Sequence, residues 1–197
     1  MHPLPISDDA LDTIFRDART FRRWQDKPVS PALLMAIYDL MRLGPTSGNC
    51  SPARIVFVVS PADKERLKPH LDEGNVGQTV TAPATAIIGF DLDFAERLPF
   101  LLPQAPNAKN AYDDPVLAER VAFRNGSIQG GYFIIAARAL GLDCGPMSGF
   151  DNAGVDREFF PDSRIRSNFL CNIGYGDPEG LRPRNPRLSF EEACRIL

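Results

Sequence analysis

The chain has 197 residues, of which 44% are hydrophobic and 24% are charged, and this composition is typical of a globular protein with one sizeable core. Its formal net charge of -3 favours neither nucleic acid nor an anionic membrane surface as a partner. No apolar stretch approaches the roughly 20 residues that a membrane-spanning helix needs. We therefore expect one domain over residues 1–197, soluble and cytoplasmic, that acts on a small molecule.

Helical spacing of apolar residues, together with capping signals, predicts six helices. Serines mark several of the starts, because Ser7 precedes two aspartates and Ser30 and Ser60 each precede a proline. The first predicted helix begins at residue 7, and the next four span 30–44, 60–71, 116–140 and 153–160. The last, short helix follows Ser189, which is expected to form a capping box with Glu192.

The helix over 116–140 is the longest, and its middle is apolar nearly all round, so we expect it to be the central buried helix. The expected buried stripe consists of Val121, Ile128, Tyr132, Ile135 and Ala139.

Runs of apolar and β-branched residues predict strands over 55–59, 84–90 and 169–175. Between residues 91 and 115 four prolines interrupt the pattern, and such a stretch inside a compact domain is often a lid or a binding loop. The irregular alternation of helices and strands indicates an α+β or α/β domain with a central sheet covered by helices.

The cysteines and histidines limit the chemistry that side chains could perform alone. The four cysteines form no C-x-x-C pair, so we expect reduced thiols that are mostly buried, with the roles of Cys50 and Cys144 open. The only histidines, His2 and His70, are too few for a histidine metal site or a Ser-His-Asp triad. We expect no metal, and difficult chemistry would fall to an organic cofactor.

Four segments place polar groups where core or a plain turn would be expected. Residues 19–24 combine arginines with a threonine, which suits a phosphate monoester, the alternative being a solvated basic turn. Residues 44–52 are small and polar and suit a flat heterocycle or a surface loop. Residues 142–150 contain glycines that permit close approach to a ligand, or a tight turn. Residues 182–187 carry three arginines in a tail that is either ordered or disordered.

Neither a G-x-G-x-x-G after a strand nor a phosphate-loop motif occurs, which disfavours the usual dinucleotide and nucleotide folds. In their order and spacing, the four segments instead resemble the FMN-dependent nitroreductases, over about residues 7–197. The motifs are Arg19-Thr20-x-Arg22 with Trp24, G-P-T-S-G-N at 44–49, A-x-x-L-G-L-D at 137–143, Pro146-x-Ser148-Gly149, and I-G-Y-G at 173–176.

The resemblance implies an α+β nitroreductase-like sandwich, in which a central, mostly antiparallel sheet is flanked by helices. It also implies an intertwined homodimer with one FMN at each end of the shared interface. Two departures from the family pattern alter the pocket lining: Ser51-Pro52-Ala53 stands where Gln-Pro-Trp is frequent, and Ser148 stands where an acidic residue is common.

The resemblance also implies roles for individual residues. The FMN phosphate or ribityl chain would be bound by Arg19, Thr20, Arg22, Arg184 and Arg187. The polar edge of the flavin ring would contact Asn75 and Gln78, and its face would lie under Pro146, Ser148 and Gly149. The flavin of the partner subunit would be reached by Pro45, Thr46, Ser47, Asn49 and Asn125.

The implied activity is an NAD(P)H-dependent oxidoreduction with ping-pong kinetics, in which the flavin carries the chemistry and no side chain is assigned as acid or base. Longer motifs at 44–54, 145–151 and 186–194 resemble the malonic semialdehyde reductases of bacterial pyrimidine degradation. They imply reduction of malonic semialdehyde to 3-hydroxypropionate. The alternatives are a broad nitro or quinone reductase and a non-enzymatic FMN-binding protein. No recognisable motif distinguishes NADH from NADPH.

Overall fold

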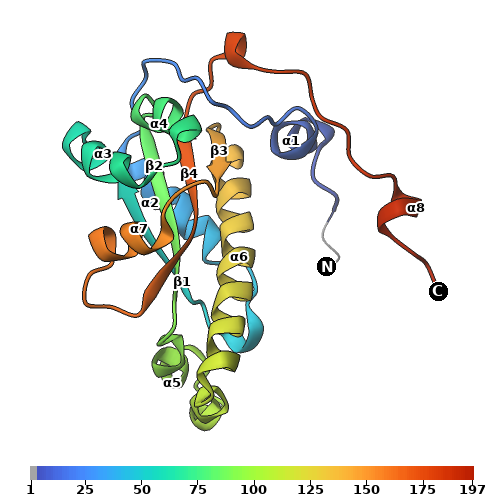
Figure 1. Ribbon diagram of the computed structural model, residues 1–197. Coiled ribbons are helices and arrows are strands. Elements are labelled where there is room, and N and C mark those ends of the chain that lie inside the picture. Colours follow the sequence, from blue (N-terminus) through green and yellow to red (C-terminus); the bar gives the residue numbers. More distant parts are fainter. Residues whose placement is uncertain (1–3) are drawn as a thin grey trace.

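A four-stranded antiparallel sheet with helices on both faces forms the centre of the computed structural model, which describes residues 4–197 (Figure 1). His2 lies outside the described residues. The strands are β1 (Ala53–Val58), β2 (Ala84–Asp91), β3 (Asp143–Met147) and β4 (Ile165–Gly174), in the spatial order β1-β2-β4-β3. Every neighbouring pair is antiparallel, so the predicted α+β architecture with a central antiparallel sheet is confirmed.

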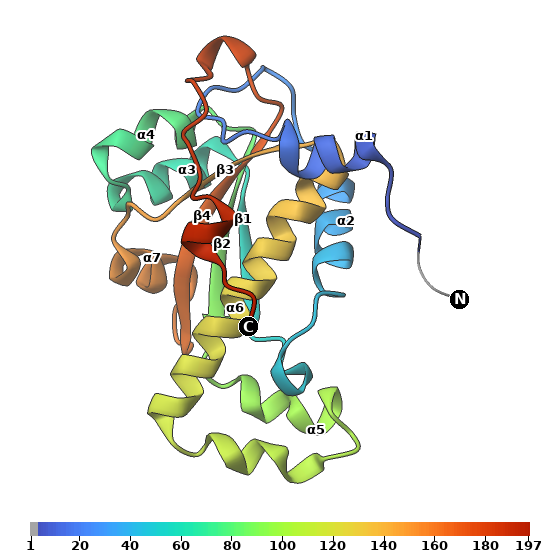
Figure 2. The same ribbon diagram turned by 90° about the vertical axis from the view of Figure 1, so that its right-hand side faces the viewer.

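Two helices cover one face of the sheet, α2 (Pro31–Met41) and α6 (Pro115–Ala139) (Figure 2). Their core includes Ile37 and Phe133, which are fully buried against Ile88 of β2. The next residue along the strand, Ile87, points to the opposite face, as the two-residue period of a strand requires.

The opposite face carries α3 (Pro61–Leu67), α4 (Glu73–Val80) and α7 (Asn152–Phe159) (Figure 2). Ile87 packs there in one cluster with Leu67 and Val155. The predicted caps are present, since the hydroxyls of Ser7, Ser30 and Ser60 accept hydrogen bonds from backbone N–H groups three residues onward. The predicted helix over 60–71 ends earlier as an α-helix and continues as a 3-10 turn, η3 (Lys68–His70).

The long helix α6 is confirmed, but its predicted buried stripe is wrong. Ile128 and Tyr132 are 40% and 38% exposed. The helix instead packs on the sheet through small residues such as Gly126 and Gly130, with Phe133 between the layers. A Cβ atom at position 130 would lie 2.5 Å from the Phe169 ring, so only glycine permits this approach. Ile128 and Tyr132 therefore face outward, although the apolar composition of the helix suggested that they were core.

The sequence did not predict two elements, helix α4 and strand β3. Helix α4 lacks an apolar stripe, because glycines and polar residues occupy most of its positions. Strand β3 was not predicted, because Gly145 and Pro146 are unfavourable in strands and suggested a ligand-approaching segment or a tight turn. Proline is tolerated here because β3 is at the edge of the sheet, where one side of the strand needs no N–H donor for the ladder.

The stretch 91–115 is not a long irregular loop. It forms η4 (Phe94–Arg97), α5 (Leu98–Leu101) and η5 (Pro106–Tyr112), which pack against the start of α6 as a small separate cluster. Phe94 and Leu98 are buried there, and the Phe94 and Tyr112 rings meet edge to face with centroids 4.9 Å apart. The prolines limit these helices to short turns without preventing a core.

Both terminal segments of the described chain lead away from the central sheet (Figure 1). The first helix begins as α1 (Asp8–Leu11) and continues as a π-helical turn, η1 (Asp12–Arg16). After η6 (Pro178–Gly180) the tail is exposed over residues 182–197, yet its last helix, α8 (Phe190–Ala193), has the predicted capping box between Ser189 and Glu192. Among the described residues, no helix is both long enough and apolar enough to cross a membrane.

The first prediction concerns the contact between α6 and the sheet. Gly130→Ala should lower the free energy of unfolding by about 1–3 kcal/mol, because the added methyl group overlaps the Phe169 ring. The control is Gly77→Ala in α4, where no atom lies within 4 Å of the added Cβ and alanine favours the helix. Urea denaturation measures both variants, and an equal effect of the two would contradict this packing.

Candidate ligand-binding site

Six arginines line one cavity of about 470 Å³. The cavity lies between residues 15–24, called the first segment below, the end of α6 and the tail. Thr20 lies among the arginines. The arginines are Arg19, Arg22, Arg138, Arg182, Arg184 and Arg187. The cavity therefore collects all five residues that the resemblance assigned to a phosphate, and adds Arg138 and Arg182, which it did not.

None of these six arginines forms an ion pair with a carboxylate among the described residues. Their neighbours do, since Arg16 pairs with Asp8 and Asp12, and Arg23 pairs with Asp177. A cavity lined by uncompensated positive charge in a protein of net charge -3 concentrates anions. Guanidinium groups match phosphate in both charge and geometry.

The arginine cavity is held together by contacts between the first segment and the tail. The Arg19 guanidinium donates to the carbonyl of Arg182. Nη2 of Arg184 donates to the carbonyls of Arg16 and Ala18, at 2.7 and 3.1 Å. These bonds place distant parts of the sequence around one space.

The first segment is also fixed to the sheet. Thr20 forms an isolated parallel bridge with Cys144 of β3, and the Phe21 N–H donates to the Cys144 carbonyl at 3.1 Å. Gly145 must be glycine here, because a Cβ would lie 2.5 Å from the Phe21 carbonyl oxygen. The edge of β3 thus positions Arg19 and Arg22.

A second group of predicted residues meets at the other end of β3. The Asn75 amide Nδ2 donates to the Gly149 carbonyl at 2.8 Å, and Nε2 of Gln78 donates to Oδ1 of Asn75 at 2.6 Å. A side chain at position 149 would collide with Asp72 and Asn75, since its Cβ would lie 2.6 and 2.7 Å from their polar atoms. Ser148 is exposed beside them, and Pro146 is half-buried.

Helix α4, which carries Asn75 and Gln78, is anchored by buried polar groups. The Gln78 carbonyl accepts from the Trp24 indole at 3.0 Å and from the Asn172 amide at 3.2 Å. Asn172 is fully buried and bonds in turn to the Thr85 hydroxyl at 2.7 Å. Trp24 therefore joins the arginine segment to α4, and both groups of residues lie along the same edge of the sheet.

A buried lysine holds the end of α4. Nζ of Lys64 donates to the carbonyls of Val80 and Ala82. Burial lowers the pKa of this ammonium group. Because the carbonyls lie where α4 ends, Lys64 satisfies acceptors that the helix itself cannot.

The third predicted group lies in the loop before β1, around the 3-10 turn η2 (Ser47–Asn49). The Ser47 N–H donates to Oδ1 of Asn125 at 2.8 Å, and Nδ2 of Asn125 donates to the Val121 carbonyl at 2.8 Å. Asn125 is 1% exposed, so it holds the loop to α6 and does not itself reach the surface of this chain. Pro45, Ser47 and Asn49 are exposed, while Thr46 is half-buried.

The backbone of this loop is strained. Gly48, Asn49 and Ser51 have φ angles of 56°, 52° and 39°, a region that residues other than glycine rarely adopt. Hydrogen bonds keep the loop in place, since the Thr46 hydroxyl accepts from the Ser51 N–H and the Asn49 amide donates to the Leu101 carbonyl at 2.8 Å. Such a rigid, exposed polar loop is suited to contacting a ligand or another chain.

Within one chain the third group is separate from the other two. Asn125 and Arg138 lie on the same helix, and their spacing in sequence corresponds to about 20 Å along its axis. The structure therefore brings together the predicted phosphate and ring residues along one edge of the sheet and leaves the 45–49 loop at the middle of α6, away from them.

The buried cysteines act as packing residues in this arrangement. Burial raises the pKa of the Cys50 thiol beneath the polar loop, so the thiol stays protonated at neutral pH. Cys144 on β3 and Cys171 on β4 are both buried, and the neighbouring Cys144 thiol, together with burial, raises the pKa of Cys171. The prediction of mostly buried free thiols is confirmed, with Cys194 the exposed one.

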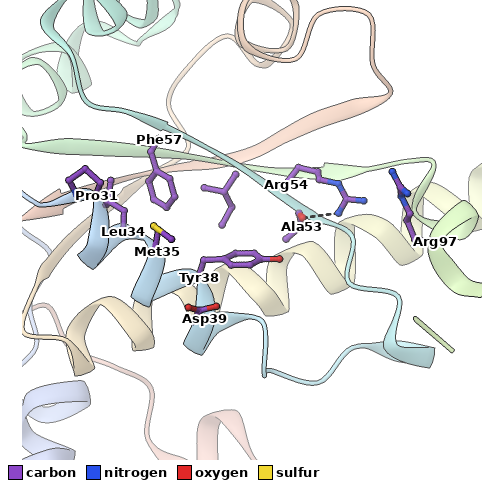
Figure 3. Close-up of a pocket in the computed structure, with 10 residues that line it drawn as sticks. Pro31, Leu34, Met35, Tyr38, Asp39, Ala53, Arg54, Phe57 and Arg97 are labelled. Carbon is purple, nitrogen blue, oxygen red and sulfur yellow. Dashed lines mark hydrogen bonds between the residues drawn. The ribbon is translucent and has the colours of Figure 1, made fainter. Parts of the chain in front are cut away.

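A larger groove, of about 690 Å³, contains none of the predicted site residues. It lies between α2 and the outer edge of β1 and is lined mainly by apolar side chains, including Met35, Tyr38 and Phe57 (Figure 3). At its end Arg54 forms an ion pair with Asp91 at 2.7 Å. Because β1 is an edge strand, the groove borders backbone groups that no strand of this chain pairs with.

The second prediction tests how the polar loop is held. Asn125→Ala should lower the free energy of unfolding by about 1–3 kcal/mol, because the Ser47 N–H and the Val121 carbonyl both lose a hydrogen bond to a buried side chain. Asn110→Ala, at an exposed position of η5, is the control and should change it little. Urea denaturation gives both values, and hydrogen exchange at Ser47 should quicken in the first variant alone. An unchanged stability would show that the loop does not depend on this amide.

Comparison with known proteins places this arrangement in a family. A sequence profile of the Nitroreductase family matches residues 15–175. A protein of Caulobacter strain K31 is 57% identical over 188 residues, which are 95% of this chain and 96% of that one. A protein of Burkholderia lata is 57% identical over 191 residues, covering 97% and 98% of the two chains. Both relatives bear the provisional name NADH dehydrogenase/NAD(P)H nitroreductase.

The fold is also found among solved structures. A provisionally named nitroreductase of Exiguobacterium sibiricum, determined in complex with FMN, superposes with a TM-score of 0.86 at 18% identity, over 99% of this chain and 100% of that one. The chain belongs to the nitroreductase family.

Proposed function

We propose that this protein is an FMN-dependent NAD(P)H oxidoreductase whose arginine cavity holds the phosphate of the flavin. The observation that carries the proposal is the set of six arginines without a carboxylate partner in the described chain. Relatives more than half identical are named NAD(P)H nitroreductases, which supports the same class of reaction.

The residues present fit FMN at both of its ends. Arg19, Thr20, Arg22, Arg184 and Arg187 would hold the phosphate and the adjoining ribityl chain through charge-assisted hydrogen bonds. Near the other end of β3, the side chains of Asn75 and Gln78 on α4 would offer amide donors and acceptors to the polar edge of a flat ring. Gly149 brings backbone close to the same place, and Pro146 and Ser148 border it.

Two protomers would complete each flavin site. Exposed apolar side chains run along α6, where Val116, Phe123 and Ile128 are 72%, 51% and 40% exposed. Large apolar side chains left exposed on a long central helix are consistent with an interface at that helix. A homodimer formed through α6 would bring Pro45, Thr46, Ser47 and Asn49 of one chain toward the arginine cavity of its partner, with Asn125 holding that loop in place.

The tail supports the same assembly. It has an ordered capping box, yet Leu188, Phe190 and Ile196 are 70%, 56% and 85% exposed. A folded segment with uncovered apolar residues needs a partner surface. The apolar groove beside the edge strand β1 offers one, and an intertwined dimer would fill it with the tail of the second copy (Figure 3).

When bound, FMN would supply reversible two-electron chemistry between a reduced nicotinamide and an acceptor. The protein would bind and orient the cofactor: the arginines would hold the phosphate, and the side-chain amides of Asn75 and Gln78 on α4 would offer hydrogen bonds to the polar edge of the ring, where negative charge is favoured by donors. In the net reaction NAD(P)H would be oxidised to NAD(P)+, the carbonyl carbon of an aldehyde would gain the hydride equivalent, and its oxygen would gain a proton from solvent. Kinetics should be ping-pong, because nucleotide and acceptor would use one pocket in turn.

For the physiological acceptor we propose malonic semialdehyde, reduced to 3-hydroxypropionate in pyrimidine degradation. The support is the set of motifs at 44–54, 145–151 and 186–194, which border the three parts of the site. The second candidate is a broad reductase of nitro compounds or quinones, and the word nitroreductase in the names of the relatives supports its nitro substrates. Three buried free thiols favour the reducing cytoplasm as its compartment.

The third prediction is that the purified protein is yellow with bound FMN and is bleached by NADH or NADPH without oxygen. Acceptors are then added anaerobically, and return of the absorbance near 450 nm, roughly the position of oxidised flavin, is followed. Faster reoxidation by malonic semialdehyde than by nitro compounds or quinones supports the proposed substrate, and the reverse order supports the second candidate. Bound flavin that no nucleotide reduces would indicate a binding protein only. A colourless protein that ignores added FMN would refute the proposal.

The fourth prediction concerns the phosphate. Arg19→Ala should weaken FMN binding by roughly ten- to one-hundred-fold, since a charge-assisted hydrogen bond is lost. The matched control is Arg23→Ala, because Arg23 lies in the same segment but pairs with Asp177 and does not line the cavity. FMN titration of the flavin-free proteins compares them, and equal affinities for the two variants would contradict the assignment.

The fifth prediction tests the tail. A chain that ends at Leu188 retains every arginine of the cavity but lacks α8 and the exposed Ile196 and Leu197. It should dissociate at least tenfold more readily than the full chain in sedimentation velocity, because the apolar groove loses its occupant. Val59→Ser, which replaces an exposed apolar residue before α3, is the control. Unchanged association of the shortened chain would remove the tail from the interface.

A further inference from the structure

Arg138 enters the arginine cavity from a different element than the expected phosphate residues. It stands in the last turn of α6, while the others belong to the first segment and the tail. The neighbouring positions Ala136 and Ala137 are buried in the core, so this arginine interrupts an apolar stretch. A charged side chain at the edge of a core destabilises the fold unless its charge is paired and its donors are hydrogen-bonded.

The contacts within the chain account for a small part of its hydrogen-bonding capacity. Nη1 of Arg138 donates to the Ile14 carbonyl at 3.1 Å, and this is the one hydrogen bond of the Arg138 side chain within residues 4–197. Nε is buried without an acceptor. A guanidinium group has five donor hydrogens, and an unpaired buried donor is unfavourable. Arg138 therefore has donors and a full charge to spare, on a side chain that lines the cavity.

The ordinary structural explanations do not account for this placement. A basic residue in the last turn does favour the helix dipole, but an exposed orientation would serve that purpose equally well. Burial raises the pKa of Asp143, and the hydrogen bond from the Gly176 N–H, at 2.8 Å, and the charge of Arg138 oppose that rise only in part. Among the described residues Asp143 forms no ion pair with Arg138. Arg138 thus lines a cavity with five other arginines, where a bound anion would accept the direct, charge-assisted hydrogen bonds that Asp143 does not.

We propose that Arg138 is a ligand of the FMN phosphate, so that the end of α6 forms one wall of the phosphate site. The inference rests on the proposed function. It assigns Arg138 to recognition of the phosphate group and not to recognition of the flavin ring. Because α6 also carries Asn125, a single helix would then position the phosphate site of one protomer and the polar loop offered to the partner.

The test compares FMN with riboflavin, which lacks the phosphate, on full-length protein freed of flavin. Quenching of flavin fluorescence gives the dissociation constant of each ligand. Arg138→Met removes the charge and the donors while keeping an apolar stem of similar length. Arg157→Met is the matched control, because Arg157 is also an arginine in the last turn of a helix, α7, away from the cavity.

We expect Arg138→Met to raise the dissociation constant of FMN about tenfold or more and that of riboflavin less than about twofold. Arg157→Met should change neither. Equal weakening of both ligands would make Arg138 a merely structural residue and overturn the proposal, as would unchanged FMN affinity. Wild-type protein that binds neither ligand would refute the proposed function itself.

Riboflavin binding also reports whether the variant is folded. If Arg138→Met does not fold, Arg138→Lys decides the matter, because lysine keeps the charge and loses the planar set of donors. A fall of about threefold or more in the ratio of FMN to riboflavin affinity supports the proposal. A ratio equal to that of the wild type overturns it.

Discussion

The mutual repulsion of six arginines around one cavity is the constraint on which this account depends. Arginines are brought together only where contacts elsewhere hold them, and here the Arg184 bonds to the first segment and the bridge between Thr20 and β3 do so. Neighbouring arginines such as Arg23 have carboxylate partners. The charge of the cavity is therefore left for an external anion, and the family of the chain makes a flavin phosphate the anion that fits best.

The rest of the site follows from what the edge of β3 supports. The arginine segment lies at the start of this strand and Gly149 just beyond its end, so a ligand with a phosphate and a flat ring can extend along it. Trp24 and Asn172 tie α4 to that edge through the Gln78 carbonyl. The polar loop at 45–49 stands at the middle of α6, away from that edge, and a second chain is the simplest way to bring such a loop to the same ligand.

The sequence predicted those parts of the molecule that local rules determine. Serine and proline pairs located α2 and α3, and apolar runs located β1, β2 and β4. Sequence patterns did not predict the elements that depend on tertiary contacts. Helix α4 has no apolar stripe, because polar residues such as Asn75 and Gln78 occupy its positions. Strand β3 contains Gly145, because the Phe21 backbone packs against it. The outward face of α6 was mistaken for core, since its exposed apolar residues, such as Ile128 and Tyr132, have the spacing of a buried stripe. Arg138 was missed because only the structure places the end of α6 beside the tail.

The central claim, that each flavin site combines the arginine cavity of one chain with the polar loop of its partner, is tested most directly with hybrid dimers. One chain carries Arg19→Glu, which spoils the cavity, and the other carries Ser47→Tyr, which spoils the exposed loop. Each variant alone should bind no FMN. After the two are unfolded together and refolded, hybrid dimers should contain one intact site, restoring roughly a quarter of the wild-type flavin content. No recovery of bound FMN, in a mixture shown to contain hybrid dimers, would contradict a site shared between chains.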